Sequence, residues 1–139
     1  MTADHVAQVA QLEKLCFADP WSESSITSEL NNPLSLWLVA EEDGCVLGYI
    51  GSQTEMGEAD MMNVAVHPEY RRRGIAQALV NGLIDALRCN DVTSLTLEVR
   101  ATNEPAKRMY EKLGFQQVGV RKNYYRHPRE DALILRQEW

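Results

Sequence analysis

The sequence lacks the marks of a membrane or secreted protein. Its 139 residues contain no unbroken apolar run long enough to cross a bilayer, which takes about 20 residues of helix. Met1 is followed by Thr2-Ala3-Asp4-His5, so no basic segment leads into an apolar one as in a secretory signal. We therefore expect no membrane association and a cytoplasmic location.

Cysteine is scarce. The chain has only Cys16, Cys45 and Cys89, which are odd in number and far apart. No Cys-x-x-Cys pair or Cys/His ligand spacing is present, so the pattern predicts neither a disulfide framework nor a zinc site. Reduced thiols fit a cytosolic protein, and we expect no bound metal.

Positive charge is also in short supply. Lys and Arg total 14 against 20 Asp and Glu, for a net charge of −6. A general nucleic-acid binder is usually basic, so direct binding of nucleic acid is not expected. An acidic surface favours a cationic partner such as a basic peptide. Many proteins are acidic without any such role, and charge alone does not decide between the two explanations.

No internal repeat, low-complexity tract or linker divides the chain, and we predict one domain over residues 1–139. Apolar periodicity and capping residues predict helices over residues 4–17, 22–30, 74–88 and 103–113. Strands are expected over residues 36–40, 45–50, 59–66, 94–100, 115–120 and 131–135. This order indicates an α+β domain with one central sheet, in which the strand–helix–strand part requires a parallel pair.

The first expected helix has one irregular feature. Val6, Val9, Leu12 and Cys16 follow the three-and-four spacing of an apolar stripe. Glu13 falls on the same stripe and is the only residue that interrupts it.

The segment most indicative of chemistry runs from Asn63 to Gln77. A strand ends at Val66, a basic loop follows, and a helix begins at Gly74. Unpaired N–H groups at a helix start bind phosphate, glycine allows close backbone approach, and Arg71–Arg73 add charge suited to a pyrophosphate. Neither a Walker A loop nor G-x-G-x-x-G is present. A solvated basic turn explains the same residues, and a nucleic-acid patch fits the net charge poorly.

This segment resembles the coenzyme A loop of the GNAT acetyltransferase superfamily, which reads Gln/Arg-x-x-Gly-x-Gly/Ala. Here the pattern is Arg71-x-x-Gly74-x-Ala76, directly after a strand that ends in Val-His-Pro. The resemblance continues downstream. The second half of the superfamily's sequence pattern is matched by residues 97–103, Ala106, 109–110 and 113–115. One branch of the superfamily, the RimI-type ribosomal-protein alanine N-acetyltransferases, has further motifs. These motifs are matched by Phe17, 20–22, 123–125, Pro128 and 130–132.

The resemblance covers roughly residues 12–135 and implies the GNAT acyl-CoA N-acyltransferase fold. That fold has a mixed, mostly antiparallel central sheet flanked by helices. Relatives usually open with a short strand before the first helix, and this chain begins inside or just before that helix. We therefore expect either that the first strand of the fold is missing here or that the true start lies upstream.

By this resemblance Glu98 is the general base and Tyr110 the general acid. From the pattern alone, Glu98 shares the solvent-facing side of its strand with Arg100, and an ion pair between them is the simpler explanation. Tyr110 alone would be a core residue of a helical stripe. The chemistry needs both roles, because an ammonium must lose a proton before it attacks a thioester. A phenol with a pKa of about 10 is protonated at neutral pH.

The resemblance also implies which residues bind acetyl-CoA. The strand before the loop splays from its neighbour and exposes backbone groups to the pantetheine arm, and an N–H near Val66 polarises the thioester carbonyl. Asn103 reads locally as a helix N-cap and by resemblance also contacts the coenzyme. The expected set is Val64, Ala65, Val66, Arg71, Arg72, Arg73, Gly74, Ile75, Ala76, Gln77 and Asn103.

On the acceptor side, the resemblance implies that Trp21, Tyr124 and Tyr125 grip the substrate peptide, the two tyrosines from a polar loop. Asp19 and Glu23 are placed to meet a basic peptide residue. The expected acceptor is a protein N-terminus, in particular the N-terminal alanine of a basic small-subunit ribosomal protein, and the enzyme is expected to be a monomer or a weak dimer. Lysine, a small amine such as a polyamine or an antibiotic, and a non-catalytic acetyl-CoA sensor stay open as alternatives.

Overall fold

The computed structural model describes residues 1–139 and contains four α-helices and six strands. The helices are α1 (Val6–Cys16), α2 (Glu23–Leu30), α3 (Ile75–Cys89) and α4 (Glu104–Lys112). The strands are β1 (Ser35–Glu42), β2 (Cys45–Glu55), β3 (Glu58–Val66), β4 (Ser94–Arg100), β5 (Gln116–Arg126) and β6 (Arg129–Glu138). Each predicted element is present, and β2, β5 and β6 extend several residues beyond the predicted limits.

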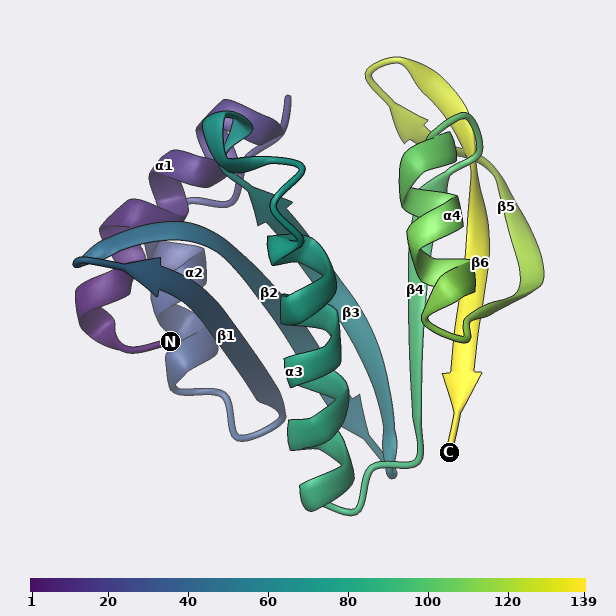
Figure 1. The fold of residues 1–139 in the computed structure, drawn as a ribbon, viewed down its shortest axis with the longest axis horizontal. Helices are drawn as coiled ribbons and strands as arrows, with labels where there is room; N and C mark the ends of the chain where they lie inside the picture. The colour runs from purple at the N-terminus through teal and green to yellow at the C-terminus, as the bar shows by residue number, and fades with distance from the viewer.

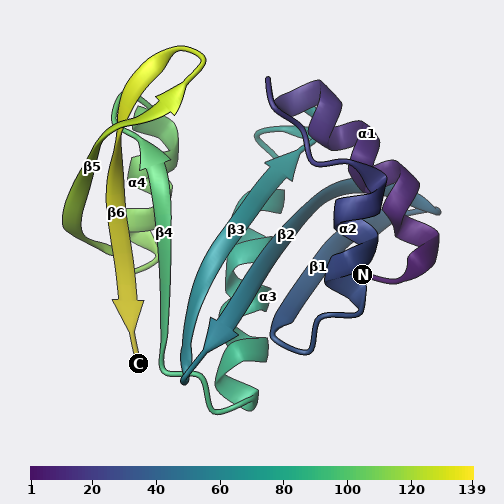
Figure 2. The ribbon, with the colours of Figure 1, turned by 180° about the vertical axis from the view of Figure 1, so that it is seen from behind.

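All six strands form one sheet in the order β1-β2-β3-β4-β6-β5. Every neighbouring pair is antiparallel except β3 and β4, which are parallel and joined through α3. Figure 1 shows α3 and α4 on one face of the sheet, and Figure 2 shows α1 and α2 on the other. The predicted α+β class, the mostly antiparallel mixed sheet and the parallel pair are confirmed.

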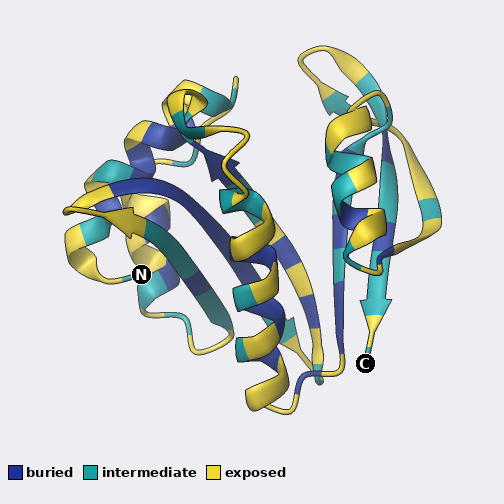
Figure 3. Cartoon of the chain, viewed as in Figure 1, coloured by how far each residue is buried: buried dark blue, intermediate teal, exposed yellow.

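Each face of the sheet has its own core. Leu83, Leu87, Leu95 and Leu97 belong to the larger cluster, between the sheet and α3 and α4. Val9 and Ile26 belong to the smaller one, which also contains Trp37 and Tyr49 and lies against α1 and α2. In Figure 3 the buried residues follow the sheet and the inward faces of these helices. No helix of the structure is both long and apolar enough to cross a membrane.

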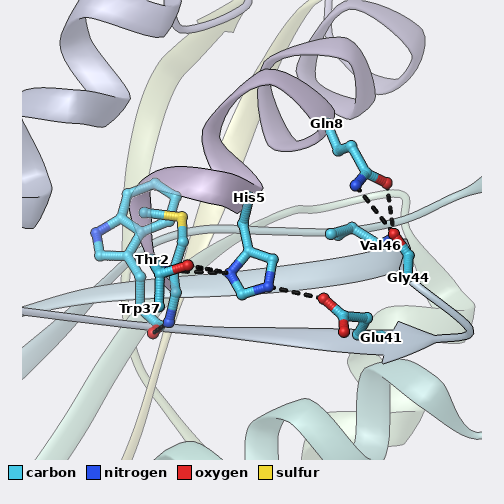
Figure 4. A network of polar contacts seen from close by, with 8 residues as sticks. Thr2, His5, Gln8, Trp37, Glu41, Gly44 and Val46 are labelled. Carbon is cyan, nitrogen blue, oxygen red and sulfur yellow. Dashed lines mark hydrogen bonds and ion pairs between the residues drawn. The ribbon is translucent and has the colours of Figure 1, made fainter.

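The structure of residues 1–139 contains no strand before α1. The chain begins with a 3₁₀ turn over Ala3–His5, and the Met1 amine donates to the Trp37 carbonyl on the outer edge of β1, at 2.9 Å. The His5 ring lies 2.7 Å from a Glu41 carboxylate oxygen. Figure 4 shows the whole network, which joins Thr2, His5 and Gln8 to Glu41, Gly44 and Val46. These contacts fasten the start of α1 to the β1–β2 hairpin.

We expect Gly51→Ala to lower the free energy of unfolding by about 1–3 kcal/mol through overpacking. A Cβ at position 51 would lie 2.3 Å from Cε2 of the buried Trp37 ring. The matched control is Gly82→Ala in the interior of α3, where the new Cβ would meet only Leu38 Cδ1, at 3.5 Å. Alanine favours a helix over glycine by about 1 kcal/mol, so this control should be stabilised. Denaturant titration checks both, and wild-type stability in Gly51→Ala would contradict the packing.

Candidate active site

The site is organised by the separation of two parallel strands. β3 pairs with β4 only where Glu58–Asp60 face Ser94–Thr96, and beyond these residues the strands diverge, as Figures 1 and 2 show. We call residues 61–66 of β3 and 97–100 of β4 the β3–β4 fork. Val64, Ala65 and Val66 lie on one arm and remain paired with β2. Their side toward β4 has no ladder partner, which is the splayed strand that the resemblance implied.

The loop after the fork presents an uncapped helix start. Gly74 is the N-cap residue of α3, has φ 77° and gives no side-chain cap. The first helical hydrogen bond runs from the Ala78 N–H to the Gly74 carbonyl, at 3.0 Å. The N–H groups of Ile75, Ala76 and Gln77 therefore have no backbone acceptor. A Cβ on Gly74 would meet no protein atom within 4 Å, so there is open space beside this glycine, and free N–H groups at a helix start suit a phosphate group.

The three loop arginines differ in their contacts. Arg71 Nε donates to the Val66 carbonyl at 3.4 Å, which ties the loop to the end of β3. Arg73 pairs with Glu42 at 3.1 Å, and its guanidinium lies over the Tyr70 ring. Arg72 has φ 66° and takes part in none of the ion pairs of the protein. Arg71 is in no ion pair either, but among the three only Arg72 has a guanidinium with neither an ion pair nor a hydrogen bond within the protein.

Tyr110 reaches the fork from α4. Asn103 caps this helix by accepting from the Ala106 N–H at 3.2 Å, so the predicted N-cap is confirmed. The Tyr110 side chain is buried, and its hydroxyl lies 3.9 Å from the Met61 sulfur on β3. Burial, with a smaller effect of Tyr125, raises the pKa of Tyr110 to about 12. Its hydroxyl is therefore protonated throughout the neutral range and available as a proton donor.

Glu98 lies on the β4 arm of the fork with its side chain about three-quarters buried, at 24% exposure. Leu97 and Val99 on either side of it point into the core. The carboxylate pairs with Arg121 of β5 at 3.2 Å. The pairing with Arg100 considered from sequence is wrong, because Arg100 instead contacts Glu130, at 3.4 Å. Arg121 is a site residue that the sequence did not indicate.

Tyr124 and Tyr125 are not in a loop, so that part of the prediction is wrong. Both belong to β5 and lie at an irregularity in its pairing with β6. Arg121 is opposite Ala132, and the next paired residue of β5 is Tyr125, opposite Glu130. The two rings meet edge to face at 5.1 Å. Burial, then the nearby Tyr124 and Glu98, raises the pKa of Tyr125 to about 12. The two tyrosines are thus brought to the same region as Glu98.

Arg100 fastens the β5–β6 hairpin to the end of β4. Its guanidinium donates to the carbonyls of His127 and Pro128 at 3.0 and 2.9 Å and lies over the Tyr125 ring. Glu130 accepts from the Thr102 N–H at 2.6 Å. Sequence reasoning assigned no function to Arg100 or Glu130, which hold the hairpin beside the fork.

The loop between α1 and α2, residues 17–22, approaches the fork from the other side. Trp21 packs against Trp37 with ring centroids 5.5 Å apart, and Ser22 caps α2 by accepting from the Ser25 N–H. Asp19 lies 3.7 Å from His127 at the tip of the β5–β6 hairpin. Glu23 is exposed at the start of α2. The structure thus brings the Trp21 loop and the tyrosine hairpin together across the fork.

Known proteins are similar to this chain in sequence. The model of the acetyltransferase (GNAT) family matches residues 6–115. The ribosomal protein bS18-alanine N-acetyltransferase of Escherichia coli K12 is 38% identical over 126 residues, covering 89% of this chain and 84% of the relative. N-alpha-acetyltransferase RimI of Mycobacterium tuberculosis H37Rv is 33% identical over 144 residues, covering 99% and 89%.

Solved structures have the same fold as this chain. The crystal structure of the E. coli ribosomal-protein-S18-alanine N-acetyltransferase has a TM-score of 0.91 and 34% identity, covering 99% of this chain and 90% of that one. Ard1 from Thermoplasma volcanium, at 24% identity, shares the fold with a TM-score of 0.90. This chain belongs to the GNAT acetyltransferase family. It is an N-acetyltransferase, and enzymes of its family take the acetyl group from acetyl-CoA.

Proposed function

We propose that this enzyme acetylates the N-terminal α-amine of a protein, in particular the N-terminal alanine of a small-subunit ribosomal protein. The observation that carries the proposal is the β3–β4 fork, where the Glu98 carboxylate and the protonated Tyr110 phenol lie on elements that border unpaired backbone. The relatives named for this activity match nearly the whole chain. The branch motifs in the sequence agree with them.

For the acetyl donor, we assign the β3 arm and the start of α3. The unpaired side of Val64, Ala65 and Val66 holds the pantetheine arm, and an N–H near Val66 donates to the thioester oxygen, where negative charge develops. The free N–H groups of residues 75–77 and the Arg72 side chain bind the pyrophosphate. Asn103, besides capping α4, contacts the coenzyme through its amide, which has both donor and acceptor atoms.

The proposed transfer is direct. Glu98 accepts a proton from the incoming ammonium, either in contact or through one water. The neutral amine nitrogen then forms a bond to the thioester carbonyl carbon, and the carbon–sulfur bond breaks. Tyr110 gives its proton to the departing thiolate, and the bonded nitrogen loses its second proton, which returns the Tyr110 phenolate to the phenol. The products are an amide and a free coenzyme thiol. Both residues act on the reacting atoms themselves.

Amine chemistry favours an α-amino group as the acceptor. An α-amine has a pKa of about 7.7–8.0, against about 10.4 for lysine. At neutral pH roughly 10–20% of the first is already unprotonated, but less than about 0.1% of the second. One carboxylate base is therefore better matched to an N-terminus than to a lysine.

We place the reaction in the cytoplasm, where a ribosomal acceptor is made. The net charge of −6 suits a basic acceptor. Trp21, Tyr124 and Tyr125 hold its backbone from both sides of the fork. Asp19, which lies beside His127 of the β5–β6 hairpin, and the exposed Glu23 at the start of α2 favour a basic residue after the acetylated one.

The test is acetyl transfer to two peptides followed by mass spectrometry. Both peptides have the same basic ribosomal sequence; one has a free N-terminal alanine, and the other has a blocked terminus and an available lysine. We expect product only on the free terminus. Acetylation of lysine alone would reject the α-amine assignment while keeping the chemistry. No product on either peptide would favour a small-amine acceptor or a sensor.

A further inference from the structure

Glu13 is a carboxylate in the core, with an exposure of 0%. It lies on the buried face of α1 among Val9, Ala10 and Leu12. Burial raises the pKa of Glu13, and its hydrogen bonds to Tyr49 and neighbours lower the pKa again in part. A buried charged group is weak evidence for stability, because a well-packed apolar residue often serves equally well. Its presence therefore calls for another explanation.

Three hydrogen-bond donors converge on Glu13 from three different segments. The Tyr49 hydroxyl of β2 donates to Oε1 at 2.6 Å, and Asn63 Nδ2 of β3 donates to the same oxygen. The Trp21 backbone N–H, from the loop between α1 and α2, donates to Oε2 at 3.4 Å. The two oxygens thus face different parts of the molecule: one faces the sheet and the other faces the loop.

Asn63 marks the place where β3 changes course. Gly51 of β2 pairs with Asn63, but the next residue, Ser52, pairs with Met61, so Met62 is an extra residue on β3. A bulge of this kind bends its strand and increases the local twist. It lies just after Asp60, the last β3 residue paired with β4. Glu13 therefore holds a side chain at the point where the β3–β4 fork begins.

The loop on the other oxygen stands at the entrance of the same fork. Trp21 packs on Trp37, and Asp19 reaches His127 across the fork. The end of α1 also touches the β3 arm, because Cys16 Sγ lies 3.7 Å from the Val66 carbonyl oxygen. Only Glu13 forms hydrogen bonds both to the backbone of this loop and to Asn63, which is next to the extra residue of the bulge.

We infer that Glu13 is a positioning residue that fixes the Trp21 loop relative to the β3 bulge and thereby sets the affinity for the acceptor peptide. Glu13 does not touch substrate, because it is fully buried. The inference rests on the proposed function only in taking Trp21 as a peptide contact. The link between loop and bulge can be tested without any acceptor.

The experiment compares Glu13→Gln with Tyr49→Phe. Glutamine has nearly the same volume as glutamate but only one acceptor oxygen. If that oxygen accepts from Tyr49 and Asn63, the NH₂ group of the glutamine faces the Trp21 N–H. Two donors then face each other, and the hydrogen bond to Trp21 is lost. Tyr49→Phe also removes a hydrogen bond from the same buried carboxylate, but it leaves the Trp21 and Asn63 contacts intact. We expect Glu13→Gln to raise KM for the alanine peptide about tenfold, the value of one lost hydrogen bond. KM for acetyl-CoA should stay within about twofold in both variants, as should KM for peptide in Tyr49→Phe.

Amide hydrogen exchange at Trp21, followed by NMR, gives a second readout that needs no turnover. Exchange should quicken about tenfold in Glu13→Gln and stay at the wild-type rate in Tyr49→Phe. Equal changes of peptide KM in the two variants would overturn the inference, since both would then reflect a weakened core. An unchanged exchange rate at Trp21 in Glu13→Gln would overturn it too, whether or not any peptide is acetylated.

Discussion

Glu98→Gln is expected to lower kcat about 100-fold near pH 7, the usual contribution of a general base. The loss should shrink as pH rises above the acceptor's own pKa of about 8, because the amine is then neutral without help from the enzyme. A pH–rate profile of wild type and variant with the alanine peptide measures this. The two curves should converge at alkaline pH.

Arg121→Gln is the matched control. It breaks the same ion pair as Glu98→Gln but leaves the carboxylate in place. Since Arg121 is more than half exposed, its pairing contributes little to stability. We expect this variant to keep the wild-type profile shape. If Glu98→Gln were as active as wild type near pH 7, or equally impaired at every pH, Glu98 would not be the base.

Most of the fold was predictable because local signals agree with one another. Strand 94–100 has the limits expected from its alternation, and Leu95, Leu97 and Val99 are all buried. The Asn103 cap begins α4 as predicted, and Gly114, at φ 102°, follows its end. The start of α3 at Gly74 was visible in the same way. These features depend on neighbours within a few residues, which a sequence displays directly.

Features that depend on register across the sheet were not predictable. The irregularity in β5 includes Asn123 at φ 55°, whose N–H is bound by Asp131. It keeps Tyr124 and Tyr125 in a strand where composition indicated a loop. The same register carries Arg121 to Glu98. A sequence shows which charged residues are present. Which of them form ion pairs depends on how β4, β6 and β5 are aligned in the sheet.

Glu13 illustrates the same limit inside a correctly predicted helix. The periodicity identified it as the single interruption of an apolar stripe. It could not show that Tyr49, Asn63 and Trp21 converge on it, since these come from three separate segments. A polar residue on a buried helix face therefore indicates that partners exist elsewhere in the chain, without indicating which ones.

Gly74→Val is expected to raise the Kd for acetyl-CoA at least about 100-fold by calorimetry. Gly74 has φ 77°, a conformation that β-branched residues rarely adopt. Valine there would turn the first N–H groups of α3 away from the phosphates that we propose they bind. A Cβ at 74 would meet no protein atom within 4 Å, so the loss would come from the altered backbone and from the new methyl groups in the space proposed for the phosphate.

Gly57→Val separates this local effect from general strain. Gly57 has φ 79°, and a Cβ there would also meet no atom within 4 Å. It lies in the β2–β3 turn, at the end of β3 opposite the coenzyme loop, as Figure 1 shows. The two variants should therefore lose similar stability from similar backbone strain, while only Gly74→Val loses coenzyme affinity. Normal affinity in Gly74→Val would remove the start of α3 from the donor site, and equal weakening in both would trace the effect to unfolding.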